Sequence, residues 1–172
     1  MSVKHPIISV TGSSGAGTTS VKRTFERIFR REGIQAAFIE GDAFHRYDRV
    51  DMKRVMAEEA KKGNNHFSHF GPKANLLEEL EAVFKKFGKS GTGRTRHYVH
   101  DEEEELLYGC PPGTFTDWEE ITSDTDVLFY EGLHGAVVTE QVNLARHCDL
   151  KIGVVPVVNL EWIQKIHRDQ MD

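Results

Sequence analysis

The strongest constraint on the fold is a glycine-rich turn that directly follows a short apolar run near the N-terminus. Ile7, Ile8 and Val10 lead into GSSGAGTT, in which Gly12 and Gly17 have the GxxxxG spacing of a phosphate-binding loop. Glycines in such a loop leave room for a ligand, so that successive backbone N–H groups surround phosphate oxygens. The helix that follows directs its positive end at the same anion. The spacing predicts a strand, a phosphate-binding loop and a helix.

This loop departs from its consensus at one position. The consensus has Lys and then Ser or Thr after the second glycine, whereas this chain has Thr18 and Thr19. Thr19 keeps the hydroxyl that would meet Mg²⁺, but the cation that normally touches the transferred phosphate is missing. A plain Gly/Ser turn between a strand and a helix is the alternative interpretation. The predicted nucleotide-phosphate ligands are Gly12, Ser13, Ser14, Gly15, Ala16, Gly17, Thr18, Thr19 and Ser20.

The rest of the chain alternates between strand and helix patterns. Apolar residues at helical spacing predict helices, and short unbroken apolar runs predict buried strands. This alternation favours an α/β fold, with a parallel sheet, helices on both faces and ligands at the carboxyl ends of the strands; together with the phosphate-binding loop, this sheet resembles that of P-loop kinases. The predicted helices are 19–32, 51–62, 74–87 and 159 onward, and the predicted later strands are 36–39, 127–130 and 150–155.

Residues 88–118 have a different character from the alternating segments. Gly91 and Gly93 precede RTRHYVH, which alternates like a strand, and an acidic run and a Pro-Pro-Gly turn follow. We expect a small insertion of short strands beside the main sheet. His97 and His100, three apart on such a strand, would point to opposite faces and form a poor metal pair.

Composition places the chain among single globular domains. Its 172 residues predict one domain, 1–172, and the net charge of −5 argues against a nucleic-acid partner. The sequence has neither an apolar run of membrane-spanning length nor a signal-peptide core. Cys110 and Cys148 lack CxxC or zinc spacing and suggest reduced thiols. We therefore expect a cytoplasmic protein without a membrane partner.

Two carboxylates follow predicted strands. Glu131, after the strand 127–130, has the position at which P-loop proteins keep the acid that serves Mg²⁺. Asp42 follows the strand 36–39, where a carboxylate could accept the proton of an attacking hydroxyl. His45 and Arg49 continue a basic face beside it. The alternatives are an ordinary acid at a strand end for Glu131 and a helix cap for Asp42.

The missing lysine calls for another cation. Lys165, Arg168 and Asp169 share one face of the last predicted helix, which follows a strand whose end should point at the nucleotide. Lys165 or Arg168 could supply the positive charge on the γ-phosphate, although a solvated charged stripe is the simpler interpretation. Lys22 competes with them, because helical side chains lean back toward the helix N-terminus.

Several segments together resemble the bacterial phosphoribulokinases, P-loop kinases of the phosphoribulokinase/uridine kinase family. These segments are ISVTGSSGAGTTSV, IEGDAFHR, FSHF, GRTRHYVH, GTFTDW, LFYEGLHG and VVPVVNLEWIQKIHRD. The resemblance implies phosphorylation of ribulose 5-phosphate at O1 by MgATP, giving ribulose 1,5-bisphosphate and ADP in the Calvin cycle. Thr at position 18 also resembles the bacterial branch of the family, which lacks the usual lysine.

The resemblance also assigns roles to residues of this chain. It implies that Asp42 is the catalytic base, that Glu131 serves the magnesium, and that His45 and Arg49 bind the sugar phosphate. In the last predicted helix it implies active-site roles for the set Lys165, Arg168 and Asp169.

Members of this family are longer, so the chain, which stops at Asp172 within a predicted helix, resembles an N-terminal fragment. The resemblance implies NADH as a possible allosteric activator and a homo-oligomer for the full-length form. A uridine or pantothenate kinase is one alternative, since such kinases share the loop and the EGL-type strand end. A non-catalytic nucleotide-binding regulatory domain is the other, suggested by the lost lysine.

Overall fold

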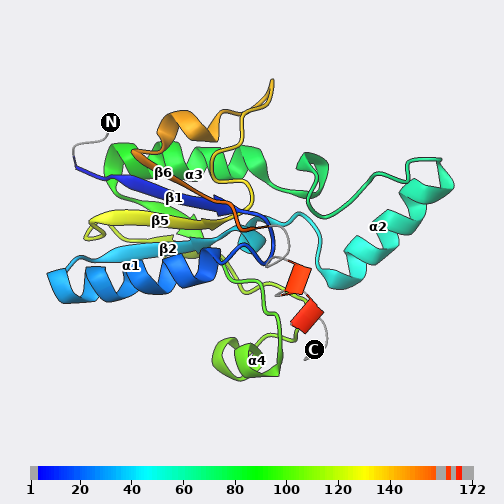
Figure 1. Cartoon of the computed structure of the whole chain (residues 1–172), viewed down its shortest axis with the longest axis horizontal. Helices are drawn as coiled ribbons and strands as arrows, with labels where there is room; N and C mark the ends of the chain where they lie inside the picture. The colour runs from blue at the N-terminus through cyan, green and yellow to red at the C-terminus, as the bar shows by residue number, and fades with distance from the viewer. Residues whose placement is uncertain (1–3, 158–161, 164–165, 168–172) are drawn as a thin grey trace.

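A parallel sheet of four strands forms the centre of the computed structural model, which describes residues 4–157, 162–163 and 166–167 (Figure 1). The strand order is β2-β5-β1-β6, so strands that follow one another in sequence are joined by crossovers. In the register, Ile7 of β1 lies opposite Leu128 of β5, and Ile8 lies opposite Leu150 of β6. The strands are β1 (Ile7–Gly12), β2 (Ala36–Glu40), β5 (Val127–Gly132) and β6 (Leu150–Val154).

Helices cover both faces of this sheet (Figure 1). Side chains of a strand alternate between faces: Val10 and Phe129 pack toward α1 (Thr18–Glu32), whereas Ile7 and Leu128 pack toward α3 (Leu77–Ser90). The predicted parallel α/β sheet with helices on both faces is confirmed, and the strand predictions agree with the observed bounds within two residues.

The apolar spacing of each covering helix explains its burial. Leu80, Val83, Phe84 and Phe87 recur every three or four residues in α3 and are almost fully buried. The helix begins and ends three residues later than predicted, and it is capped by Gly91, whose φ of 69° is the left-handed conformation that terminates helices. Helix α2 (Arg49–Lys61) has a weaker apolar pattern, and it projects away from the sheet (Figure 1).

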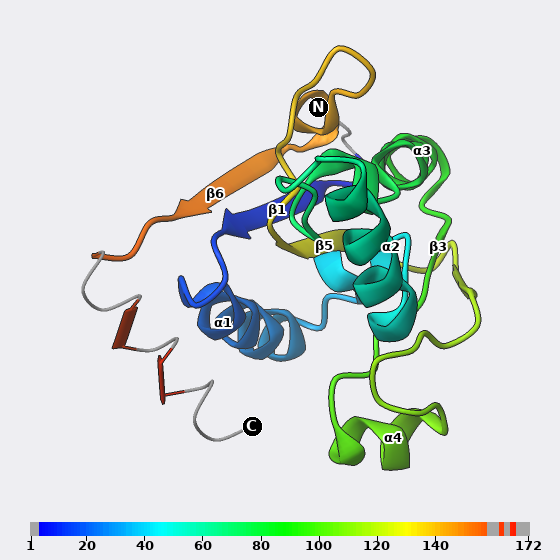
Figure 2. The same cartoon turned by 90° about the vertical axis from the view of Figure 1, so that its right-hand side faces the viewer.

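The predicted insertion is present, with different contents. Strands β3 (Gly93–Thr95) and β4 (Glu119–Ile121) form an antiparallel pair, and the helix α4 (Glu102–Tyr108) lies between them in sequence. The RTRHYVH segment is a strand only in its first residues, so the prediction of a strand through His100 is wrong. Helix α4 lies beside the body of the molecule, away from the sheet (Figure 2).

Short 3-10 turns connect the larger elements, namely η1 (Gly41–Phe44), η2 (Pro72–Ala74) and η3 (Leu144–His147). Turn η1 follows β2 directly and carries Asp42. The predicted last helix, from 159 onward, lies largely outside the described residues; 162–163 and 166–167, which are described, are helical. Among the described residues, none of the helices combines the length and apolarity needed to cross a membrane.

Candidate functional site

The glycine-rich turn is built as the sequence predicts. It leaves β1 at Gly12 and enters α1 at Thr18, and Gly15 and Gly17 adopt positive φ angles of 85° and 93°. An added Cβ at Gly12 would lie 2.9 Å from both the Val154 carbonyl oxygen and the Thr18 methyl carbon. The loop therefore requires glycine at its start.

The first turn of α1 faces this loop without an acidic side chain, and its N-cap is Gly17, which has no side-chain acceptor. The first N–H groups of a helix have no partner within the helix. They are suited to an anion, as is the positive end of the helix dipole. All nine predicted phosphate ligands, 12–20, lie in this loop or in the first turn of α1.

Thr18, at the position of the missing lysine, faces the strand-end acid. Its side chain is buried and hydrogen-bonds the carboxylate of Glu131. Burial raises the pKa of Glu131, and the nearby Glu40 carboxylate adds to this effect, although the Thr18 hydroxyl opposes it. Glu40 and Glu131 lie opposite each other at the ends of β2 and β5. Thr19, the next residue of α1, is exposed.

This donor set fits Mg²⁺. Hard oxygen ligands suit that ion, which usually keeps several waters and is bound through one or two carboxylates plus substrate phosphates. Glu131 supplies a half-buried carboxylate, Thr19 an exposed hydroxyl, and the neighbouring Glu40 raises the local negative charge. Glu131 and Thr19, the two predicted metal ligands, lie at the same edge of the sheet as the phosphate-binding loop.

The competing cation, Lys22, is engaged elsewhere. Its ammonium group hydrogen-bonds the Glu40 carboxylate and lies 4.0 Å from Glu26. Burial alone would lower the pKa of Lys22, but the Glu40 hydrogen bond and charge raise it above its usual value. Lys22 thus neutralises the strand-end acids. The other candidates, Lys165, Arg168 and Asp169, lie outside the described residues.

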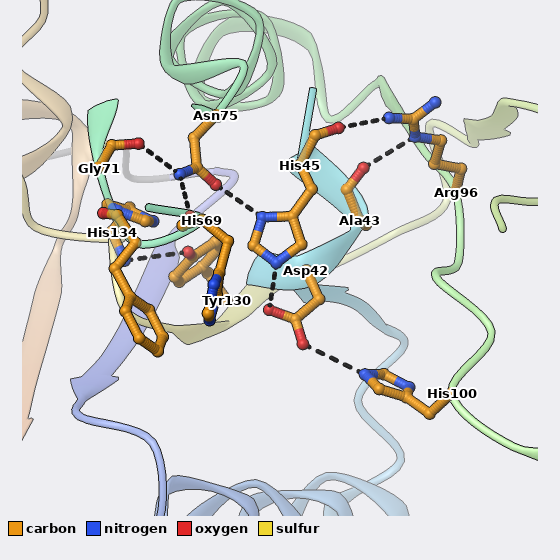
Figure 3. A network of polar contacts seen from close by, with 11 residues as sticks. Asp42, Ala43, His45, His69, Gly71, Asn75, Arg96, His100, Tyr130 and His134 are labelled. Atoms are coloured by element: carbon orange, nitrogen blue, oxygen red, sulfur yellow. Dashed lines mark hydrogen bonds and ion pairs between the residues drawn. The ribbon is translucent and has the colours of Figure 1, made fainter. Parts of the chain in front are cut away.

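Asp42 is held by two histidines (Figure 3). Its Oδ1 lies 3.1 Å from Nε2 of His45, and its Oδ2 lies 3.1 Å from Nε2 of His100. Burial alone would raise the pKa of Asp42, but the two imidazole donors hold it well below its usual range. Asp42 does not cap the following helix: the N-cap of α2 is Asp48, which accepts from the Asp51 N–H.

A cavity of about 320 Å³ opens beside Asp42. It is lined by Asp42 and His45, by α2 residues that include Arg49 and Lys53, and by Tyr98 from the insertion. A basic and partly apolar cavity next to a carboxylate suits a phosphorylated polyol, because the cations can hold its phosphate and the carboxylate its hydroxyl. The predicted sugar-phosphate ligands His45 and Arg49 thus share one cavity with the predicted base.

The insertion also fixes the turn that carries Asp42. Arg96 donates to the carbonyl oxygens of Ala43 and His45, both at 2.8 Å (Figure 3). Its guanidinium lies over the ring of Phe115, 3.7 Å from the centroid, and over that of Trp118 at 4.7 Å. The turn η1 is therefore anchored through its backbone by a residue more than fifty positions away in sequence.

Sequence reasoning missed His100, Asn75, Arg96 and Lys53. His100 drew attention only as half of a histidine pair on a strand, but it lies in a loop and reaches Asp42, while His97 stacks on Tyr108. Lys53 follows Arg49 by four residues on α2, a helical spacing that could have identified it. For His100 and Asn75 the pairing is set by loop conformation, which no local periodicity reveals.

Comparisons with known proteins agree with this geometry. The profile of the Phosphoribulokinase / Uridine kinase family matches residues 7–172. A phosphoribulokinase of Nitrobacter vulgaris is 70% identical over 167 residues, which are 97% of this chain and 58% of the relative. A phosphoribulokinase of Rhizobium meliloti is 68% identical over 170 residues, 99% of this chain and 58% of that relative. The chain thus spans somewhat more than half the length of these curated relatives.

Solved structures give the same result. The phosphoribulokinase from Rhodobacter spheroides superposes with a TM-score of 0.85 at 58% identity, over 98% of this chain and 57% of that one. A possible uridine kinase from Bacillus stearothermophilus has the same fold, with a TM-score of 0.60 at 13% identity, over 99% of this chain and 82% of that one. By profile, sequence and fold, the chain belongs to the phosphoribulokinase/uridine kinase family.

Proposed function

We propose that the protein containing this chain is a phosphoribulokinase, which transfers the γ-phosphoryl group of ATP to O1 of ribulose 5-phosphate in the Calvin cycle. The observation that carries the proposal is that the Asp42 carboxylate lines the basic cavity and follows β2 at the carboxyl-end edge of the sheet, the edge from which the phosphate-binding loop also leaves β1. The names of the relatives at 68–70% identity favour this substrate over uridine or pantothenate. The Asp42 carboxylate contacts two histidines and lines the basic cavity, which argues against a purely regulatory nucleotide-binding domain.

In the proposed reaction, backbone N–H groups of residues 12–20 hold the nucleotide phosphates at the N-terminus of α1. Arg49 and Lys53 hold the phosphate of the acceptor in the cavity. Asp42 accepts the proton of the O1 hydroxyl as this oxygen bonds to the γ-phosphorus and the bond to ADP breaks. Phosphoryl transfer requires mainly positioning and charge stabilisation, so a carboxylate of low basicity can serve.

Mg²⁺ would be held by Glu131 and the Thr19 hydroxyl together with phosphate oxygens. When bound, the ion neutralises charge on the β- and γ-phosphates. The cation that replaces the loop lysine is proposed to be Lys165 or Arg168, with Asp169 beside them in the same site. Residues 1–172 are proposed to be part of one kinase domain.

An ADP-release assay on the full-length protein tests the proposal. MgATP is supplied with ribulose 5-phosphate, uridine or pantothenate in parallel, with and without NADH. We expect turnover with ribulose 5-phosphate alone, whereas ATP binding without turnover on any acceptor would contradict a catalytic role. The NADH arm and sizing chromatography test two further expectations, allosteric activation and a homo-oligomer of the full-length protein. The proposed location of this kinase is the cytoplasm.

A further inference from the structure

The carboxylate of Asp42 is held from two sides by units of the same design. Each unit is a histidine whose Nε2 contacts one Asp42 oxygen and whose Nδ1 contacts a second polar side chain. Figure 3 shows both Nε2 contacts and the contact of His45 with Asn75. On one side His45 Nδ1 lies 2.8 Å from Oδ1 of Asn75. On the other, His100 Nδ1 lies 2.9 Å from Oε2 of Glu104. Of the two histidines, His45 follows the turn η1 that carries Asp42, whereas His100 comes from the insertion.

The partners of the rings determine their protonation. Asn75 donates its amide to the carbonyl oxygens of His69 and Gly71, both at 2.8 Å, so its Oδ1 must accept from His45. The Glu104 carboxylate can only accept, and it also accepts from the backbone N–H of His100 at 2.7 Å. Both Nε2 atoms face a carboxylate. All four contacts are satisfied when both rings carry a proton on each nitrogen.

From this geometry we infer that His100, oriented by Glu104, is a second positioning residue for Asp42, equivalent to His45 oriented by Asn75. The inference rests on the proposed function, because it concerns the same carboxylate. A carboxylate has about four lone-pair directions. The two rings occupy one on each oxygen and leave the others for an acceptor hydroxyl in the cavity.

The insertion delivers His100 through specific local contacts. Asp101 caps α4 by accepting from the Glu104 N–H at 2.9 Å, which turns the Glu104 side chain back toward His100. Arg49 donates to the His100 carbonyl oxygen at 3.0 Å. Arg49, which lines the cavity, is therefore hydrogen-bonded to the residue that carries the second histidine ring. Binding of a phosphate by Arg49 would act on the loop from which His100 reaches Asp42.

Other ionisable groups surround the contact between Asp42 and His100. Besides His45 and His100, the Asp42 charge acts on Tyr130 and Glu131 of β5 and on His134 just after that strand. Burial lowers the pKa of His134, so this ring stays neutral where His100 is charged. The carboxylates of Asp42 and Glu104 raise the pKa of His100 to about 9, although burial opposes them. His45 and His100 are therefore the cations in contact with Asp42 among the described residues.

The kinetic test compares His100→Ala, His100→Gln and Glu104→Gln in the full-length protein, with His97→Ala as the matched control. His97 belongs to the same loop but stacks on Tyr108. We expect His100→Ala to lower kcat by ~10-fold or more with a smaller change in KM, and to move the acid limb of kcat to higher pH. His100→Gln keeps a neutral hydrogen-bond donor, so its kcat should be higher than that of His100→Ala.

A loss confined to KM, or equal losses in His100→Ala and His97→Ala, would overturn the inference. An independent measurement is the NMR titration of the His100 ring, which needs no turnover. We expect its pKa to lie well above that of a free histidine and to fall in Asp42→Asn. If the pKa of the His100 ring is that of a free histidine and does not change in Asp42→Asn, the contact is refuted even in an active kinase. A shifted ring in a protein without ribulose 5-phosphate turnover would refute the proposed function instead.

Discussion

The two halves of the candidate site are positioned by different forces. Gly12, Glu40 and Glu131 lie at the ends of three neighbouring parallel strands, where the backbone register brings them together. Arg96 and His100 reach the same place from the insertion, through side-chain hydrogen bonds and ring contacts. The strand-end half of the site should therefore be disrupted by added atoms, and the insertion half by the loss of hydrogen-bond donors.

Asp42 lies where the two halves meet, and its replacement should have the largest effect. Asp42→Asn removes the proposed proton acceptor of the O1 hydroxyl and the negative partner of both histidines. We expect kcat to fall by ~10² or more with MgATP binding largely preserved. Steady-state kinetics and nucleotide titration on the full-length protein measure this. Asp51→Asn, an exposed carboxylate of α2, is the control. Normal turnover of Asp42→Asn would make Asp169 the better candidate for the base.

The strand-end half is tested by adding one methyl group. In Gly12→Ala the new Cβ would meet a backbone carbonyl and a side chain, both at 2.9 Å, so the loop must shift. Overpacking of this kind costs roughly 1–3 kcal/mol, and 1.4 kcal/mol corresponds to about tenfold in affinity. We therefore expect MgATP affinity to fall about tenfold or more in an equilibrium titration.

Gly153→Ala is the matched control for this substitution. Gly153 pairs with Thr11 next to the loop, and an added Cβ there would meet open space. Equal losses of MgATP affinity in the two variants would show that the tight packing around Gly12 does not set the shape of the loop.

The sequence was informative where the backbone decides the structure. Short apolar runs predicted the four strands, and the carboxyl-end rule for parallel sheets predicted that Asp42 and Glu131 follow strands at the edge that carries the phosphate-binding loop. The fold prediction succeeds because strand register and helix packing depend on patterns that persist over many residues.

The insertion was only partly predictable for the opposite reason. Alternation in RTRHYVH suggested a longer strand than β3, yet Arg96 and His97 leave the strand to contact η1 and Tyr108. Tertiary contacts of single side chains outweigh strand propensity in such short segments. Thr18 gives a second example. Its hydroxyl was known from the sequence, but its bond to Glu131 depends on the placement of two separate elements.

The insertion half is tested at Arg96. Arg96→Lys keeps the charge but loses the planar fork that serves two carbonyl oxygens and stacks on Phe115. We expect a loss of about 1–3 kcal/mol in the free energy of unfolding, measured by urea denaturation. Proteolysis within 93–121 should also become faster.

Arg94→Lys is the control. Arg94 also lies over the Trp118 ring, 4.6 Å from the centroid, but its guanidinium pairs with the half-exposed Glu79 instead of the carbonyl oxygens that Arg96 serves, and such pairs contribute roughly 0–1 kcal/mol. If Arg96→Lys were no less stable than Arg94→Lys, the anchoring of η1 by the insertion would be contradicted.

The smallest expected effect is the pH dependence of stability that arises from His100. Its pKa is raised from 6.5 to about 9 in the folded chain, so its contribution is fully present below pH 6.5 and is lost as the pH rises toward 9. Because the side chain is 41% exposed, screening should limit this contribution to below about 1 kcal/mol. Urea midpoints measured on both sides of this interval should fall more in the wild type than in His100→Gln, whose amide does not titrate. Equal falls in the two proteins would mean that the insertion holds Asp42 without a charged histidine, and the second half of the site would then rest on Arg96 alone.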